Sequence, residues 1–223
     1  GMMAAIRAGQ HKKNVLLIFS SQMQLQSLIR NSHSHYMRVI KTIIIYLKRI
    51  NIPVNLFIFN MANPPNGAEL TKGTKITMRT FKSPNYNLYR TIINFADVLI
   101  TDSTWHPSLL DAVSLNLPSA VIGNSMSLGE DGNYESKFES TDPEVFKLLN
   151  QGVREAPQTI FPFSCFPLKD PKPQEFRYYD DVYPYYLLDI YSDESALAFL
   201  GEFLDSGEVM DDLRDFQEFY LKR

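Results

Sequence analysis

Two short apolar segments, NVLLIFS at residues 14–20 and VNLFIF at residues 54–59, decide the fold class of this chain. Runs of this length and composition are typical of strands buried on both faces of a parallel sheet. Between them, residues 36–50 carry apolar side chains at helical spacing, with arginines and lysines mostly on the other side. Pro53 ends this predicted helix. The three segments together predict a βαβ unit.

The same alternation continues along the chain. Residues 63–73 contain two prolines and two glycines and are expected to form an exposed loop. Further strands are expected at residues 75–81, 97–102 and 120–123, and further helices at residues 87–95 and 107–115. Alternating strands and helices predict an α/β fold, a single doubly wound Rossmann-like domain with a mostly parallel sheet.

The C-terminal part is less regular. The sequence TDPE at residues 141–144 fits a capping box, with Thr141 as the cap of a helix that runs to residue 149. Five prolines between residues 157 and 173 exclude regular structure there. Residues 176–191 are dense in tyrosine, and we expect them to form a strap over the domain surface.

Two helices are expected to end the chain. Ser192 is positioned to cap a helix over residues 193–204, and an acidic amphipathic helix follows Gly207. We therefore divide the chain into a tag remnant and lead (1–13), a Rossmann-like domain (14–156), and a Pro/Tyr-rich strap with C-terminal helices packing on the same domain (157–223).

Composition indicates a folded, soluble, cytoplasmic protein. Hydrophobic residues make up 44% and charged residues 21% of the 223 residues, close to globular averages. The single cysteine, Cys165, cannot form an intramolecular disulfide, and four irregularly spaced histidines do not suggest a metal site. The longest apolar stretch, at residues 43–47, is too short to cross a membrane, and no signal peptide is expected.

The charges are unevenly distributed. Residues 1–100 contain 13 lysines and arginines against two acidic residues, whereas the remainder contains nine against 23. A basic half suggests an anionic partner, such as a phosphorylated small molecule or a membrane surface, unless the two halves neutralise each other in the fold. Nucleic acid is disfavoured because the basic residues are not clustered with aromatic ones.

Three loops follow the expected strands at the edge of the sheet where ligands bind, at residues 20–26, 102–108 and 123–134. The middle loop is the most informative. Pro107 favours a helix start, which would leave the backbone amides of Ser108 and Leu109 free to hold a phosphate. The hydroxyl groups of Ser103, Thr104 and Ser108 would add further donors.

Two ionisable residues flank this predicted phosphate site. Asp111 lies about one turn into the helix, where it could bind a ribose diol or could merely complement the helix dipole. His106 is a candidate general base or phosphate donor, because its ordinary pKa is near neutral, or it is simply a loop residue.

Residues 95–123, FADVLITDSTWHPSLLDAVSLNLPSAVIG, resemble the donor-binding segment of GT-B glycosyltransferases. Asp111-Ala112 match the acidic residue and alanine of that segment's helix, and Leu117-Pro118 match the turn into the next strand. The resemblance implies a nucleotide-sugar donor, with Ser103, Thr104 and Ser108 as phosphate contacts and Asp111 as the ribose contact. No permanently bound cofactor and no metal are expected.

The same residues leave several functions open. The start of the segment, DVLITD followed by serine, also resembles CDP-polyol phosphotransferases, so the donor would be UDP-linked or CDP-linked. GT-B enzymes have two Rossmann-like domains and this chain has room for one, which implies a donor-binding half completed by a partner subunit, by a homo-oligomer or at a membrane surface. Residues 102–106 lack the glycines of the phosphate loop, so a non-catalytic interaction module remains the alternative.

Overall fold

The computed structural model describes residues 12–19, 33–61, 65–103, 106–123, 127–128, 134–135, 142–155, 185–202, 204 and 218. The strands are β1 Lys13–Ile18, β2 Val54–Phe59, β3 Ile76–Phe81, β4 Val98–Thr101, β5 Ser119–Gly123, β6 Ser127–Leu128, β7 Tyr134–Glu135 and β8 Tyr186–Asp189. The helices are α3 His33–Ile50, α4 Gly67–Leu70, α5 Tyr86–Ile93, α6 Ser108–Ser114, α7 Pro143–Glu155 and α8 Asp193–Gly201.

Six strands form one parallel sheet in the order β3-β2-β1-β4-β5-β8, and β6 and β7 form a separate antiparallel hairpin. Strand β1 lies in the middle of the sheet. Strands β2 and β3 lie on one side of it, and β4, β5 and β8 lie on the other. This is the strand order of Rossmann folds. The predicted α/β Rossmann-like class is confirmed.

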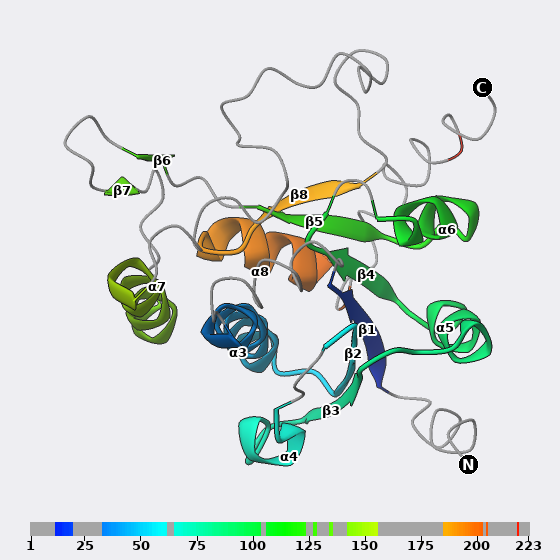
Figure 1. Ribbon diagram of the computed structural model, residues 1–223, viewed down its shortest axis with the longest axis horizontal. Helices are drawn as coiled ribbons and strands as arrows, with labels where there is room; N and C mark the ends of the chain where they lie inside the picture. The colour runs from blue at the N-terminus through cyan, green and yellow to red at the C-terminus, as the bar shows by residue number, and fades with distance from the viewer. Residues whose placement is uncertain are drawn as a thin grey trace.

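Helices cover both faces of the sheet (Figure 1). On one face, α3 and α8 pack on alternate residues of the strands, such as Val15 and Ile100, and Val145 of α7 joins the same core. On the other face, α5 and α6 pack on the intervening residues, such as Leu16 and Leu99. Because the inner strands β1, β2, β4 and β5 are largely buried on both sides, their sequences are mostly apolar runs rather than alternating ones.

Local signals set the limits of several elements. Asn85 caps α5 by accepting a hydrogen bond from the amide of Leu88, and Ser192 caps α8 as expected, accepting from the amide of Ser195. Asn116, after the end of α6, has a φ of 49°, a left-handed conformation that asparagine tolerates better than most residues.

Three local expectations were wrong. The expected loop at residues 63–73 contains a short helix, α4, and the tyrosine-rich segment contributes β8, the sixth strand of the sheet. The cap of α7 is Asp142 rather than Thr141, since Asp142 Oδ1 accepts hydrogen bonds from the amides of Glu144 and Val145. Thr141 itself and residues 157–173 lie outside the described part of the chain.

Candidate functional site

The strand order changes direction between β1 and β4, and ligands of open α/β sheets bind beyond the carboxyl ends of such a strand pair. The chain that leaves β4 at this point is polar but buried. Asp102 and Ser103 are 1% and 4% exposed, and Thr101, at the end of β4, is fully buried. Thr101 Oγ1 has no hydrogen-bond partner within the described part of the chain. Buried polar side chains therefore lie at the predicted edge of the sheet.

The start of α6 differs from the sequence-based expectation. The amide of Ser108 donates a hydrogen bond to His106 Nδ1 at 3.2 Å, and the amide of Leu109 donates to the carbonyl of His106 at 3.0 Å. The prediction of two free amides was therefore wrong, because the imidazole ring occupies the place that a serine or aspartate side chain takes at other helix starts. A phosphate could reach these amides only if His106 moved away.

This contact also fixes the chemistry of His106. Its Nδ1 accepts the amide hydrogen of Ser108 and lies 2.7 Å from Ser108 Oγ, so the proton of the neutral ring is on Nε2. Burial lowers the pKa of His106 below its ordinary value, which favours the neutral ring. The remaining function of the ring is to donate a hydrogen bond from Nε2, and this arrangement suits a donor better than a general base.

Asp111 lies on the side of α6 that faces α5. Its Oδ2 accepts a hydrogen bond from the hydroxyl group of Tyr89, and its Oδ1 lies 3.5 Å from Arg90 Nη1. About a third of the Asp111 side chain, 36%, stays exposed to solvent. Tyr89 and Arg90 were not among the predicted site residues, because the sequence predicts a helix at residues 87–95 but not its contact with α6.

The other predicted site residues lie in different environments. Ser108 is 1% exposed and packs at the helix start, and the side chain of Leu109 belongs to the apolar core between α6 and the sheet. Ser103 lies close to them, since its carbonyl accepts a hydrogen bond from the amide of His106. Thr104 lies outside the described residues, as does the loop predicted at residues 20–26.

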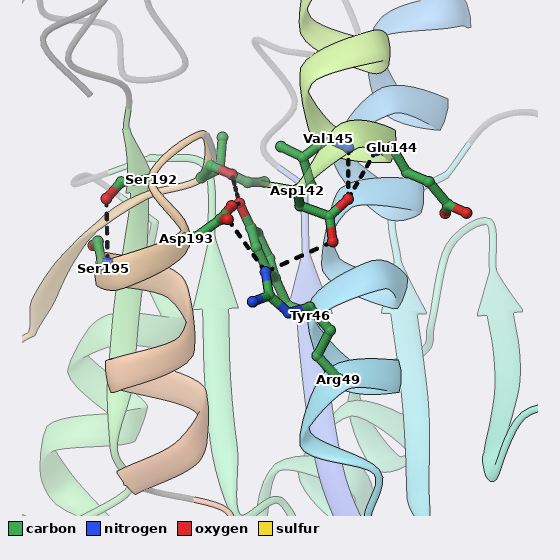
Figure 2. Close-up of polar contacts among 9 residues, drawn as sticks. Tyr46, Arg49, Asp142, Glu144, Val145, Ser192, Asp193 and Ser195 are labelled. Atoms are coloured by element: carbon green, nitrogen blue, oxygen red, sulfur yellow. Dashed lines mark hydrogen bonds and ion pairs between the residues drawn. The ribbon is translucent and has the colours of Figure 1, made fainter. Parts of the chain in front are cut away.

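A second polar cluster lies on the opposite face of the sheet (Figure 2). Tyr46 and Arg49 of α3 reach Asp193 at the start of α8, and Arg49 also reaches Asp142 at the start of α7. Burial, and secondarily the nearby Asp193 carboxylate, raise the pKa of Tyr46, so its hydroxyl group remains a donor. The sequence predicted caps at Thr141 and Ser192, each directly before one of these aspartates, but gave no sign that Asp142 and Asp193 share a partner.

Neither cluster has the composition of a metal centre. Across the residues that the structure describes, no group of three or more His, Cys, Asp or Glu side chains could hold a metal ion. Within the same residues, no helix has the length and apolar character needed to cross a membrane.

Comparison with known proteins places the chain in a family. It belongs to the family of unknown function DUF6365, whose profile matches residues 8–223. No curated protein matches the chain significantly. Among solved structures, a complex of S. aureus MnaA with UDP is similar at 14% sequence identity and a TM-score of 0.37, over 71% of this chain. The chain spans 40% of the length of that protein.

Proposed function

We propose that this member of the DUF6365 family binds a nucleotide-sugar at the carboxyl edge between β1 and β4, as the donor-binding part of a GT-B-type glycosyltransferase. The observation that carries the proposal is positional. The predicted binding stretch within the GT-B-like segment, residues 102–111, begins where the strand order of the sheet changes direction. In Rossmann-like folds this position receives the phosphates of a nucleotide.

In this proposal the residues of the segment have different roles. His106 donates a hydrogen bond from Nε2 to a phosphate oxygen, because its Nδ1 is already engaged by Ser108. Ser103 and Thr104 provide further polar groups, and Asp111 accepts hydrogen bonds from the ribose hydroxyls with the lone pairs that Tyr89 leaves free. The acceptor side of the reaction would come from a partner subunit, a second copy or a membrane-bound acceptor.

A titration with nucleotides tests the proposal. UDP, CDP and their sugar conjugates should raise the melting temperature, since a ligand at 100 times its Kd stabilises a protein by about 2.7 kcal/mol. Asp111→Asn should weaken binding roughly tenfold, the value of one charge-assisted hydrogen bond. Glu144→Gln, an exposed carboxylate on the opposite face, is the matched control and should leave affinity unchanged. Preference for CDP over UDP would indicate a CDP-polyol phosphotransferase instead.

The occupied amides at the start of α6 favour a second candidate, a non-catalytic interaction module that keeps the fold without a ligand. In that case the imidazole of His106 is a permanent helix cap. No nucleotide would then bind at millimolar concentration, and His106→Asn would change stability alone. Saturable binding of any nucleoside diphosphate would exclude this second candidate.

A further inference from the structure

Asn66 and Gly67 form the only Asn-Gly pair in the sequence. The pair stands at the start of α4, where Asn66 is exposed and its side chain forms no capping hydrogen bond. Glycine has no Cβ, so nothing on Gly67 itself shields its amide nitrogen from the side chain before it. The pair therefore has the chemistry for a reaction between the Asn66 side chain and the Gly67 amide.

The backbone conformation of Asn66 controls this reaction. Its ψ of 97° turns the Gly67 nitrogen away from Cβ, so ψ must rotate before that nitrogen can reach Asn66 Cγ. The rotation unwinds the start of α4, because the Asn66 carbonyl accepts hydrogen bonds from the amides of Glu69 and Leu70. The α4 helix has four residues and buries none of them, and elements with few buried contacts open at a low free energy. The fold therefore leaves this rotation accessible.

We propose that Asn66 is a site of spontaneous deamidation, and that its isoaspartate product weakens the packing of α4 on β3. The Gly67 nitrogen loses its proton and attacks Asn66 Cγ. The new N–Cγ bond replaces the bond to the side-chain amide nitrogen, which leaves as ammonia. Water then adds to one of the two carbonyl carbons of the cyclic imide and breaks its C–N bond. Addition at Cγ gives aspartate, and addition at the backbone carbonyl carbon gives isoaspartate.

Isoaspartate changes the backbone where α4 meets β3. The chain then runs through the side-chain carbons of residue 66, which adds one atom between the Cα atoms of residues 66 and 67. The carbonyl that accepts the amides of Glu69 and Leu70 leaves the main chain at the same time. A Cβ at Gly67 would lie 3.2 Å from the carbonyl oxygen of Met78, so Gly67 has little room to move toward β3. The longer backbone should therefore displace α4 outward.

Incubation of the full-length folded protein in mildly alkaline buffer, followed by peptide mass spectrometry, tests the site. Residue 66 should gain the mass of an amide-to-acid conversion at least about tenfold faster than Asn51 or Asn94, equivalent to a barrier lower by about 1.4 kcal/mol. Asn51 and Asn94 are internal controls, since both are exposed and each precedes a bulky residue. Asn66→Ser keeps a capping residue and should abolish the mass gain.

Equal rates at the three asparagines would overturn the proposed site. A mass gain that appears only after unfolding in urea would also overturn it, because α4 would then hold ψ in place. The isoaspartate form, separated from the other products, should unfold at a lower urea concentration than Asn66→Asp, which carries the same charge on an ordinary backbone. Equal urea midpoints would overturn the weakened packing of α4.

Discussion

The hydroxyl group of Tyr89 on α5 donates a hydrogen bond to Asp111 Oδ2 on α6, and this contact joins the two helices that cover one face of the sheet (Figure 1). Burial, followed by the hydrogen bond to Asp111, raises the pKa of Tyr89, so the phenol remains a donor at neutral pH. Arg90 pairs with the other oxygen of the carboxylate. Asp111 therefore contributes to stability whether or not it also binds a ribose.

Asp111→Asn should lower the free energy of unfolding by about 0.5–1 kcal/mol. The asparagine can still accept the hydrogen bond from Tyr89, but it loses the ion pair with Arg90, which solvent partly screens. Urea denaturation measures the change. Adding Arg90→Met to Asp111→Asn should cost little more, because the pair is already absent. Additive losses in the double variant would contradict this assignment.

His106 should make stability depend on pH. Burial lowers its pKa in the folded state, so the unfolded chain binds the proton more readily. This contribution to stability is complete above the unfolded pKa of about 6.5 and is lost as the pH falls from there through the folded pKa, by at most about 1.4 kcal/mol per pH unit.

The matched variant for this effect is His106→Asn, since asparagine also caps helices and does not titrate. Urea denaturation of both proteins between about pH 7.5 and pH 5 isolates the histidine from all other ionisable groups. The stability of the wild type should fall relative to the variant as the pH decreases. A constant difference would show that the ring protonates equally well in the folded and unfolded chains.

The fold class could be predicted because β1, β2, β4 and β5 are buried on both faces and each is a run of apolar residues. The edge strand β8 was missed because Tyr186 and Leu187 stay exposed, so its sequence is not a buried run. The α4 helix was missed because it has only four residues and buries none of them. Both missed elements have only four residues and bury at most one of them, which is too little for a sequence pattern to show.

The candidate site was predicted from the sequence only as a location, and its role in binding stays a prediction. The loop after β4 was chosen because the carboxyl end of a parallel strand is a general binding position. Its internal contacts were not found, because a histidine cap one residue before a proline has no common sequence signature. Contacts between helices, such as Tyr89 with Asp111 and Arg49 with Asp193, depend on packing angles that the spacing within one helix does not encode.

Tyr46→Phe should lower the free energy of unfolding by about 1–2 kcal/mol. The single hydrogen of the buried hydroxyl group is shared between the carbonyl of Ile190 at 3.0 Å and Asp193 Oδ1 at 3.3 Å, and the substitution removes this donor from both acceptors. Tyr86→Phe is the control, since Tyr86 is 71% exposed and should change stability by less than about 0.5 kcal/mol. Equal urea midpoints for the two variants would show that the Tyr46 hydroxyl group contributes nothing.

Two glycine-to-alanine substitutions should have opposite effects on stability. A Cβ at Gly67, at the start of α4, would lie 3.2 Å from both the carbonyl oxygen and the Cε of Met78 on β3. The backbone of a sheet strand cannot easily move away, so Gly67→Ala should destabilise the protein by about 1 kcal/mol or more. At Gly201, the last residue of α8, a Cβ would meet no atom of the described residues within 4 Å. Gly201→Ala should therefore stabilise the protein by about 0.4–1 kcal/mol, because alanine restricts the unfolded chain and favours the helix.

Thermal and urea denaturation of both variants measure the difference between the two effects. A neutral or stabilising Gly67→Ala would mean that α4 is not closely packed on the edge of β3.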